Sequence, residues 1–194
     1  EALYPTDNEI ADTLLNTQRP NIITIIFEGL SAELVEELGG QSGVTPNFSR
    51  LAKEGILFTN LYANSFRTDR GTVSALSGYL GLPTVSIMKV PTKSRTLPAI
   101  SEELVKAGYH TDFLYGGDIN FTNMKSYLLS KGYQKLTADT DFSLSERTSN
   151  VWGVNDDITS EWLLEELKKR PETDGPWFTT YLTLSSHEPF EVPY

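Results

Sequence analysis

The chain has 194 residues and a mass of 21.6 kDa, which is enough for one sizeable domain or a large piece of one. Its 39% hydrophobic and 22% charged residues exclude a disordered, collagen-like or coiled-coil chain. A net charge of −10 argues against nucleic acid as a partner, and the lack of cysteine excludes disulfides and thiolate metal sites.

Strand and helix patterns alternate from residue 21 onward, after a polar segment of residues 1–20 that we interpret as a linker or lead-in helix. The β-branched run over residues 21–27 predicts a central strand that is buried on both faces. The other predicted elements are, in chain order, a helix over 45–52 ended by Gly55, a strand over 56–62, helices over 68–80 and 97–107, a strand over 109–115, an amphipathic helix over 156–169, a turn over 171–176 and a strand over 177–184.

This alternation predicts an α/β fold with a mostly parallel central sheet flanked by helices. Ligands of such sheets bind beyond the carboxyl ends of the strands, so residues that directly follow a strand are the first candidates for a site. No apolar run approaches the roughly 20 residues of a membrane span. Because the chain starts at Glu1 without a methionine, we expect a piece of a longer protein with any signal or anchor segment upstream.

Three polar residues follow predicted strands. Glu28 comes directly after the first strand, where a carboxylate acts as a ligand of a hard cation, as a general base, or only as a solvated residue. Asp118 follows two glycines, which indicates either a close approach to a ligand or a tight turn. His187 is one of only two histidines in the chain and follows the last strand, where a capping or surface role is the alternative to ligand binding.

The segment around Thr68 carries the strongest chemical signal. Thr68 is predicted at or near a helix N-terminus, where free N–H groups and the helix dipole favour an anion. Arg67 and Arg70 flank it in an otherwise acidic chain. A threonine hydroxyl is a poor nucleophile unless a base or a metal activates it, and Glu28 is the candidate holder of such a metal. The alternative is that Thr68 is simply the N-cap of the helix.

Read together, six segments resemble the sulfatase-like branch of the alkaline phosphatase superfamily, specifically the lipoteichoic acid synthases and related phosphoglycerol transferases. The resemblance covers about residues 21–194, which it identifies as the N-terminal portion of a catalytic domain. The segments that carry it are residues 21–31, residues 45–55, Arg67-Thr68 with Gly71, Gly116-Gly117-Asp118, Trp152-Gly153-Val154-Asn155-Asp156, and residues 184–190 with His187.

The resemblance implies a role for each candidate residue. Glu28 is similar to the N-terminal metal ligand of the family, and Thr68 to the metal-bound nucleophile that forms a phosphothreonine intermediate. His187 and Asp118 are similar to substrate-binding residues of the same pocket, and we assign Arg67 and Arg70 to substrate binding as well. The implied cofactor is a divalent metal ion, Mn²⁺ or Mg²⁺, with Zn²⁺ as the alternative. The Asp-His pair that completes the family's metal site does not occur before the chain ends.

The resemblance also implies a substrate and a place. The substrate is a phospholipid or a phosphorylated glycan, and the place is the extracytoplasmic face of a bacterial cell membrane, reached through segments outside this chain. Two departures put glycerophosphate specificity in doubt. The lipoteichoic acid synthases carry a histidine in place of Gly116, and a Trp-Asn-Arg cluster where this chain reads Thr122-Asn123-Met124.

Three functions therefore stay open at the level of sequence. The first is a metal-dependent transferase of a phospho-headgroup, and the second is a hydrolase of phosphate or sulfate esters. The third is a binding ectodomain that keeps the fold without turnover. A sulfatase with a formylglycine is disfavoured, because the chain lacks the Cys/Ser-x-Pro-x-Arg pattern from which that group is made. With Glu28 and Thr68 as its only ligands, the chain alone is expected to be inactive and to bind Mn²⁺ weakly.

Overall fold

The computed structural model describes residues 15–171 and 175–191. Most of the predicted lead-in segment therefore lies outside the described residues, and residues 15–20 form bends without a helix. Within the described residues, no helix is long and apolar enough to cross a membrane.

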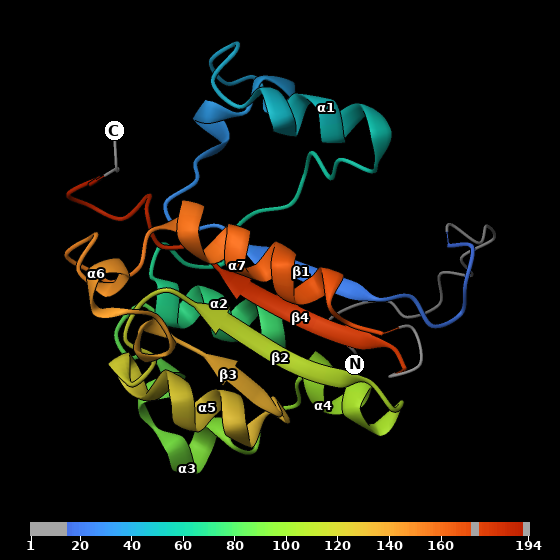
Figure 1. The fold of residues 1–194 in the computed structure, drawn as a ribbon, viewed down its shortest axis with the longest axis vertical. Coiled ribbons are helices and arrows are strands. Elements are labelled where there is room, and N and C mark those ends of the chain that lie inside the picture. The colour runs from blue at the N-terminus through green and yellow to red at the C-terminus, as the bar shows by residue number, and fades with distance from the viewer. Residues whose placement is uncertain (1–14, 172–174, 192–194) are drawn as a thin grey trace.

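A parallel sheet of four strands forms the centre of the molecule, as predicted (Figure 1). The strands are β1 (Ile22–Ile26), β2 (His110–Tyr115), β3 (Lys135–Thr137) and β4 (Trp177–Leu182), in the spatial order β1-β4-β2-β3. All three neighbouring pairs are parallel, so the carboxyl ends of all four strands point in the same direction. The α/β fold class is confirmed.

Helices cover both faces of this sheet. The α-helices are α1 (Pro46–Glu54), α2 (Thr68–Ser77), α3 (Pro91–Ser94), α4 (Ile100–Lys106), α5 (Met124–Ser130), α6 (Leu144–Arg147) and α7 (Asp156–Lys168). Short 3₁₀ turns lie at Ala32–Leu34, Glu36–Leu38, Ile87–Lys89, Phe121–Asn123 and Asp139–Asp141.

Two apolar clusters hold the layers together. The larger one joins one face of the sheet to α2 and α5 through buried side chains: Val73, Leu76, Met88, Tyr109, Phe113, Ile119, Met124, Tyr127, Leu128, Tyr133, Ala138, Phe178 and Leu182. The smaller one joins Leu114 and Tyr181 to Leu163 of α7 on the other face. Because α2, α5 and α7 bury apolar side chains against the strands, the strand ends stay at fixed positions at one rim of the sheet.

The first strand does not lie where its sequence predicts. β1 is at the edge of the described sheet, paired only with β4, and its side chains alternate between half-buried and exposed. Ile23 and Ile25 are 44% and 46% exposed, whereas Ile22 and Ile26 pack against the larger cluster. The prediction of a central strand buried on both faces is therefore wrong for this sheet. A continuous apolar run records a preference for burial, but the position in the sheet is decided by which neighbours pair with it.

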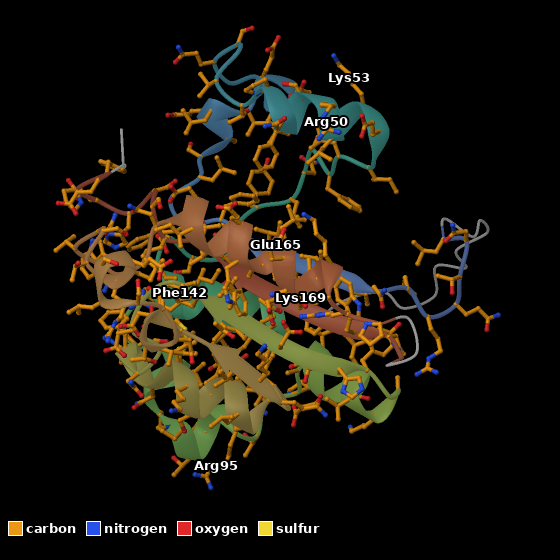
Figure 2. All side chains as sticks on the ribbon, in the orientation of Figure 1. Arg50, Lys53, Arg95, Phe142, Glu165 and Lys169 are labelled. Carbon is orange, nitrogen blue, oxygen red and sulfur yellow. The ribbon has the colours of Figure 1, made fainter. Side chains whose placement is uncertain are left out.

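The predicted strand over residues 56–62 is also wrong. This segment has no strand, and its apolar side chains are exposed, from 37% at Leu57 to 81% at Tyr62. A strand needs a partner for its backbone groups, and no described strand runs beside this segment. It belongs to the long connection over residues 30–66, in which α1 lies away from the sheet (Figure 1). Figure 2 shows Arg50 and Lys53 on α1, at a distance from the strands.

The other predicted helices and strands form with shifted ends. The helix from Pro46 ends at the predicted Gly55, and the amphipathic helix forms as α7. Helix α2 ends earlier than predicted, at Gly78, which adopts a left-handed φ of 64° that favours glycine at a helix end. Four short elements were not predicted from the sequence, namely α3, α5, α6 and β3.

Candidate active site

A cavity of about 580 Å³ opens at the carboxyl ends of β1, β2 and β4. It is lined by Glu28, Phe66, Arg67, Thr68, Asp69, Tyr115, Asp118, Phe121, Met124, Val151, Trp152, Leu184 and His187. Five of the six residues that the sequence singled out are among them. The parallel sheet explains why Glu28, Asp118 and His187 converge, because the segments that follow its strands emerge at one rim. Arg67 and Thr68 follow no described strand and reach the cavity from the start of α2.

Glu28 and Thr68 meet directly in this cavity, although 40 residues separate them in the chain. The hydroxyl of Thr68 donates a hydrogen bond of 2.6 Å to Oε2 of Glu28. The backbone N–H of Glu28 donates to Oγ1 of Thr183 at 2.8 Å, which ties the exit of β1 to the exit of β4. Gly29 supports this close approach, since its φ is 63° and any Cβ there would overlap the carbonyl oxygen of Ser186.

Thr68 is the first residue of α2 rather than its N-cap. The N-cap position is held by Arg67, and no side chain caps the helix. The simple capping role for Thr68 is therefore wrong, because its hydroxyl points to Glu28 instead of to the backbone of the helix. The N–H groups of the first turn have no acceptor within the helix, so they add positive potential on this side of the cavity.

The two arginines beside Thr68 differ in position. Arg67 is exposed and lines the cavity. Arg70 instead lines a small separate hollow with Val73 and Tyr79, and its Nε is buried without a hydrogen-bond partner among the described residues. The structure thus does not bring Arg70 to the cavity, because the two-residue step from Thr68 along α2 rotates its side chain by about 200° to the opposite side of the helix.

Asp118 and His187 stand on the walls of the cavity. Oδ1 of Asp118 accepts hydrogen bonds from the backbone and side-chain nitrogens of Asn120, at 2.9 and 3.0 Å. Asp118 therefore forms the tight turn that the glycines indicated and lines the cavity as well. Nδ1 of His187 lies 2.8 Å from the carbonyl oxygen of Glu188.

Tyr115, the last residue of β2, was not singled out by its sequence. Burial raises the pKa of its hydroxyl well above the usual range, and the nearby carboxylates of Glu28, Asp118, Asp156 and Asp139 raise it further. The hydroxyl therefore stays protonated at neutral pH and offers the cavity a neutral donor. The sequence signal that could have identified Tyr115 as a site residue is its position at the end of a predicted apolar strand.

The segment 152–156 connects the walls of the cavity. The backbone N–H of Val154 donates to the carbonyl of Gly116 at 2.9 Å, so this segment lies against the end of β2. The carboxylate of Asp156 accepts the N–H groups of Leu184 and Ser185, at 2.7 and 2.8 Å, and thereby holds the exit of β4. The resemblance pointed to this segment without giving it a role, and its role in the fold is to join two strand exits.

Gly116 is required by that contact. A Cβ at Gly116 would overlap the carbonyl oxygen of Val154, and one at Gly153 would overlap the carbonyl oxygen of Gly116. A histidine at position 116, as in the lipoteichoic acid synthases, does not fit this arrangement of the two backbones. At the second departure from that family, Met124 is 1% exposed and lines the cavity with an apolar surface.

Glu28 and Thr68 fit one part of a site for a hard cation. A carboxylate oxygen and a hydroxyl oxygen are ligands that Mg²⁺ and Mn²⁺ accept. Three carboxylates line the cavity, from Glu28, Asp69 and Asp118. Over residues 15–171 and 175–191, however, no group of three or more acidic, histidine or cysteine side chains is arranged to hold a metal ion. Two donors from this part of the chain are thus an incomplete set.

The fold and the rim site define an α/β protein of the alkaline phosphatase type, with helices around a parallel sheet and polar residues at its carboxyl ends. The sulfatase family model matches residues 20–194. The chain belongs to the sulfatase family.

Curated relatives agree with this assignment. The chain is 24% identical over 176 residues to the lipoteichoic acid synthase-like protein YvgJ of Bacillus subtilis, an alignment that covers 89% of the chain. It is 33% identical over 127 residues, or 58% of the chain, to an ulvan-active sulfatase of Formosa agariphila. The two alignments cover 28% and 21% of the relatives' lengths, so the chain spans only a part of these proteins.

Solved structures share the fold. A protein of the alkaline phosphatase superfamily from Vibrio parahaemolyticus is 31% identical and superposes with a TM-score of 0.79, over 91% of this chain and 43% of that one. The lipoteichoic acid synthase LtaP of Listeria monocytogenes is 18% identical, with a TM-score of 0.78 over 90% of this chain and 42% of that one. The periplasmic domain of EcEptC from Escherichia coli, solved with Zn, is 17% identical, with a TM-score of 0.65 over 91% of this chain and 47% of that one.

Proposed function

We propose that this chain is the nucleophile-bearing part of a metal-dependent transferase that moves a phospho-headgroup, similar to phosphoglycerol, through a phosphothreonine at Thr68. The observation that carries the proposal is the hydrogen bond of 2.6 Å from the Thr68 hydroxyl to Glu28, within the cavity at the rim of the sheet. A threonine hydroxyl becomes a nucleophile only when a base or a metal activates it, and the carboxylate of Glu28 is placed to accept its proton.

In this proposal, Oγ1 of Thr68 forms a bond to phosphorus while the bond from phosphorus to the oxygen of the lipid alcohol breaks, and that oxygen takes up the proton that Thr68 gives up. The proton of the hydroxyl leaves along the hydrogen bond that already joins it to Oε2 of Glu28. The hydroxyl of an acceptor then forms a bond to the same phosphorus, the bond from phosphorus to Oγ1 breaks, and Oγ1 takes up the acceptor's proton. Glu28 and Thr68 would also hold a divalent cation, Mn²⁺ or Mg²⁺ with Zn²⁺ as the alternative, together with donors from outside the described residues. When bound, that cation supplies positive charge that favours the deprotonated hydroxyl.

The remaining residues of the cavity bind and orient the substrate. The free N–H groups of the first turn of α2 and the guanidinium of Arg67 stabilise negative charge on the phosphoryl oxygens. Asp118 and His187 contact the headgroup from the opposite wall, and Tyr115 adds a neutral hydroxyl donor. Arg70 has no part in this proposal, because it lines a different hollow.

The donor is a phospholipid or a phosphorylated glycan, and the protein acts at the extracytoplasmic face of a bacterial membrane. The similarity to lipoteichoic acid synthases supports the lipid donor. Attachment to the membrane would come from segments outside this chain.

The second candidate is an ester hydrolase, in which water releases the group from Thr68. The similarity of 33% to an ulvan-active sulfatase favours it, as does the apolar surface of Met124 where the transferases carry an arginine. A third candidate is a binding domain without turnover, which predicts that Thr68 is not modified by any substrate.

Trapping of the covalent intermediate separates these candidates. The complete gene product is incubated with Mn²⁺ and either a detergent-dispersed phospholipid or a small aryl phosphate or sulfate ester, then quenched in acid and analysed by peptide mass spectrometry. The transferase predicts a phosphorylated peptide at Thr68 with the phospholipid. Modification by the aryl ester alone supports the hydrolase, and an unmodified Thr68 with both substrates contradicts the covalent mechanism.

A further inference from the structure

Hydrogen bonds between side chains and backbone groups join two loops at the rim of the cavity, the loop before α7 and the loop after β4. Trp152 is at the centre of this junction. Nε1 of Trp152 donates to the carbonyl oxygen of Glu188 at 2.7 Å. In the same junction, the backbone N–H of Val151 donates to the carboxylate of Glu191 at 2.8 Å. The side-chain amide of Asn150 donates to the carbonyl of Glu191 at 3.1 Å. The loop after β4 is therefore held by the loop before α7.

The loop that carries Trp152 is itself firmly placed. Asn150 and Gly153 exchange two backbone hydrogen bonds, at 3.2 and 3.1 Å, which leaves Val151 and Trp152 at the tip of a tight turn. Asn150 is buried, and the following Val154 is fully buried and bonded to the end of β2. A side chain on such a turn has a fixed position relative to the sheet.

The imidazole of His187 shares its acceptor with this tryptophan. Nδ1 of His187 lies 2.8 Å from the carbonyl oxygen of Glu188, the same atom that accepts from Trp152. Because a carbonyl only accepts, this hydrogen bond requires the proton on Nδ1. The indole and imidazole rings also pack together, with centroids 4.4 Å apart and planes at 54°. Nε2 has no hydrogen-bond partner in the part of the chain that the structure describes.

We infer that Trp152 is a positioning residue that holds His187 in the Nδ1–H tautomer, with an unprotonated Nε2 free for the substrate. The inference rests on the proposed function for the substrate that His187 meets. The shared carbonyl fixes the tautomer, since the bond made by one ring nitrogen decides which nitrogen carries the proton. The packed indole fixes the orientation of the ring. In this tautomer the neutral ring accepts a hydrogen bond from a hydroxyl of the headgroup, as glycerol or a sugar provides.

Nitrogen NMR of the ¹⁵N-labelled full chain tests this inference directly. The chain has only two histidines, and His110 is exposed at the start of β2, the end of the strand away from the cavity, so it serves as an internal reference. At a pH where both rings are neutral, we expect His187 as the Nδ1–H tautomer. In Trp152→Ala we expect a mixture of both tautomers at His187 and unchanged signals from His110.

Trp152→Phe separates the two contacts, because phenylalanine keeps an aromatic ring against the imidazole and removes the Nε1–H donor. We expect a partial loss of the Nδ1–H tautomer in this variant. An Nε2–H tautomer in the wild-type chain, or an unchanged tautomer in a folded Trp152→Ala variant, overturns the inference. If the alanine variant does not fold, an unchanged His187 in Trp152→Phe overturns it equally.

Turnover by the complete gene product gives a second readout. Trp152→Phe should raise KM for a hydroxyl-bearing substrate several-fold and leave kcat nearly unchanged, since His187 binds the headgroup and does not react. A fall in kcat with an unchanged KM contradicts the positioning role. The tautomer of His187 does not depend on Thr68, so the two hypotheses can fail separately. An active Thr68→Ala variant would refute the proposed function. The expected His187 signals in that variant would still support the role of Trp152.

Discussion

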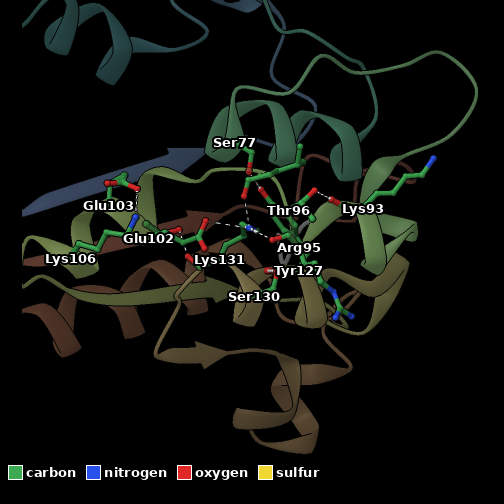
Figure 3. A network of polar contacts seen from close by, with 12 residues as sticks. Ser77, Lys93, Arg95, Thr96, Glu102, Glu103, Lys106, Tyr127, Ser130 and Lys131 are labelled. Atoms are coloured by element: carbon green, nitrogen blue, oxygen red, sulfur yellow. Dashed lines mark hydrogen bonds and ion pairs between the residues drawn. The ribbon is translucent and has the colours of Figure 1, made fainter.

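Two polar clusters in this molecule differ in burial and in how many of their groups are hydrogen-bonded. Lys131, at the end of α5, has a side chain that is 0% exposed. Its ammonium donates to the carbonyl of Arg95 at 3.0 Å, to the carbonyl of Leu97, and to the carboxylate of Glu102 at 3.2 Å (Figure 3). Thr68 and Glu28 instead make one hydrogen bond with each other and line an open cavity.

The difference separates a structural role from a chemical one. The three donors of Lys131 meet three acceptors, so the buried cluster is complete and joins α4, α5 and the loop before α4. The pair of Glu28 and Thr68 lines the cavity, and in the described part of the chain the hydrogen bond between them is the one that their side-chain oxygens make. A polar cluster that is complete stabilises the fold, and one that is incomplete at a cavity has capacity to bind a ligand or a metal.

The largest effect should come from Thr68→Ala in the complete gene product. Because the hydroxyl is the proposed nucleophile, turnover should fall on the order of 10⁴-fold or more, as measured by release of the lipid alcohol. The free energy of unfolding should fall by only about 1 kcal/mol, the net value of one hydrogen bond.

Thr68→Ser keeps the hydroxyl and should retain part of the activity. Thr72→Val is the matched control one helical turn further on, where a buried Oγ1 has no partner in the described residues and is absent from the cavity lining. Full activity of Thr68→Ala would refute the covalent mechanism.

The second effect concerns the complete cluster. Lys131→Met should lower the free energy of unfolding by about 3–5 kcal/mol, because it removes a fully buried donor and leaves the carbonyls of Arg95 and Leu97 and the partly exposed carboxylate of Glu102 without it. Urea denaturation of the full chain measures this. Lys106→Met is the control, since Lys106 forms an exposed pair with Glu103 nearby in Figure 3 and its loss should produce no measurable change. Equal changes in the free energy of unfolding for the two variants would show that the buried hydrogen bonds of Lys131 do not stabilise the fold.

The third effect tests the contact that separates this chain from the lipoteichoic acid synthases. Gly116→Ala should lower the free energy of unfolding by about 1–3 kcal/mol, because its Cβ would overlap the carbonyl of Val154 and displace the segment that carries Trp152. Gly71→Ala is the control of opposite sign. Gly71 lies inside α2, and a Cβ there would make only an ordinary contact of 3.8 Å with the carbonyl oxygen of Ser65, so alanine should stabilise the chain by about 0.5–1 kcal/mol. An unchanged free energy of unfolding in Gly116→Ala would mean that the backbones at Gly116 and Val154 move apart without loss of stability.

The smallest effect is expected for metal binding by the chain alone. Calorimetry with Mn²⁺ should detect only weak binding, with a dissociation constant on the order of 1 mM or weaker, because Glu28 and Thr68 supply two ligands. Tight stoichiometric binding would reveal further ligands in this chain. The affinity of Glu28→Gln for Mn²⁺ would then show whether Glu28 and Thr68 are among the ligands.

Sequence reasoning succeeded where a local pattern and a general rule of the fold coincide. The strands and helices alternate, so Glu28, Asp118 and His187 were expected at one rim, and the cavity is lined by all three. Prediction from sequence failed where the position of an element depends on which other strands pair with it. β1 reads as a central strand but lies at the edge of the described sheet, and residues 56–62 read as a strand but have no partner. Trp152 and Tyr115 were missed because an aromatic residue in a motif or at a strand end is more often part of a core.

The order of elements and the residue types of the rim were determined by the sequence alone, because hydrophobic periodicity and turn residues act over a few neighbours in the chain. Only the tertiary structure decided which of these residues face one another. It placed Thr68 against Glu28 and turned Arg70 to another side of the same helix. It also made one carbonyl serve both Trp152 and His187. Such contacts join segments 35 or more residues apart, and their geometry depends on how the whole sheet packs.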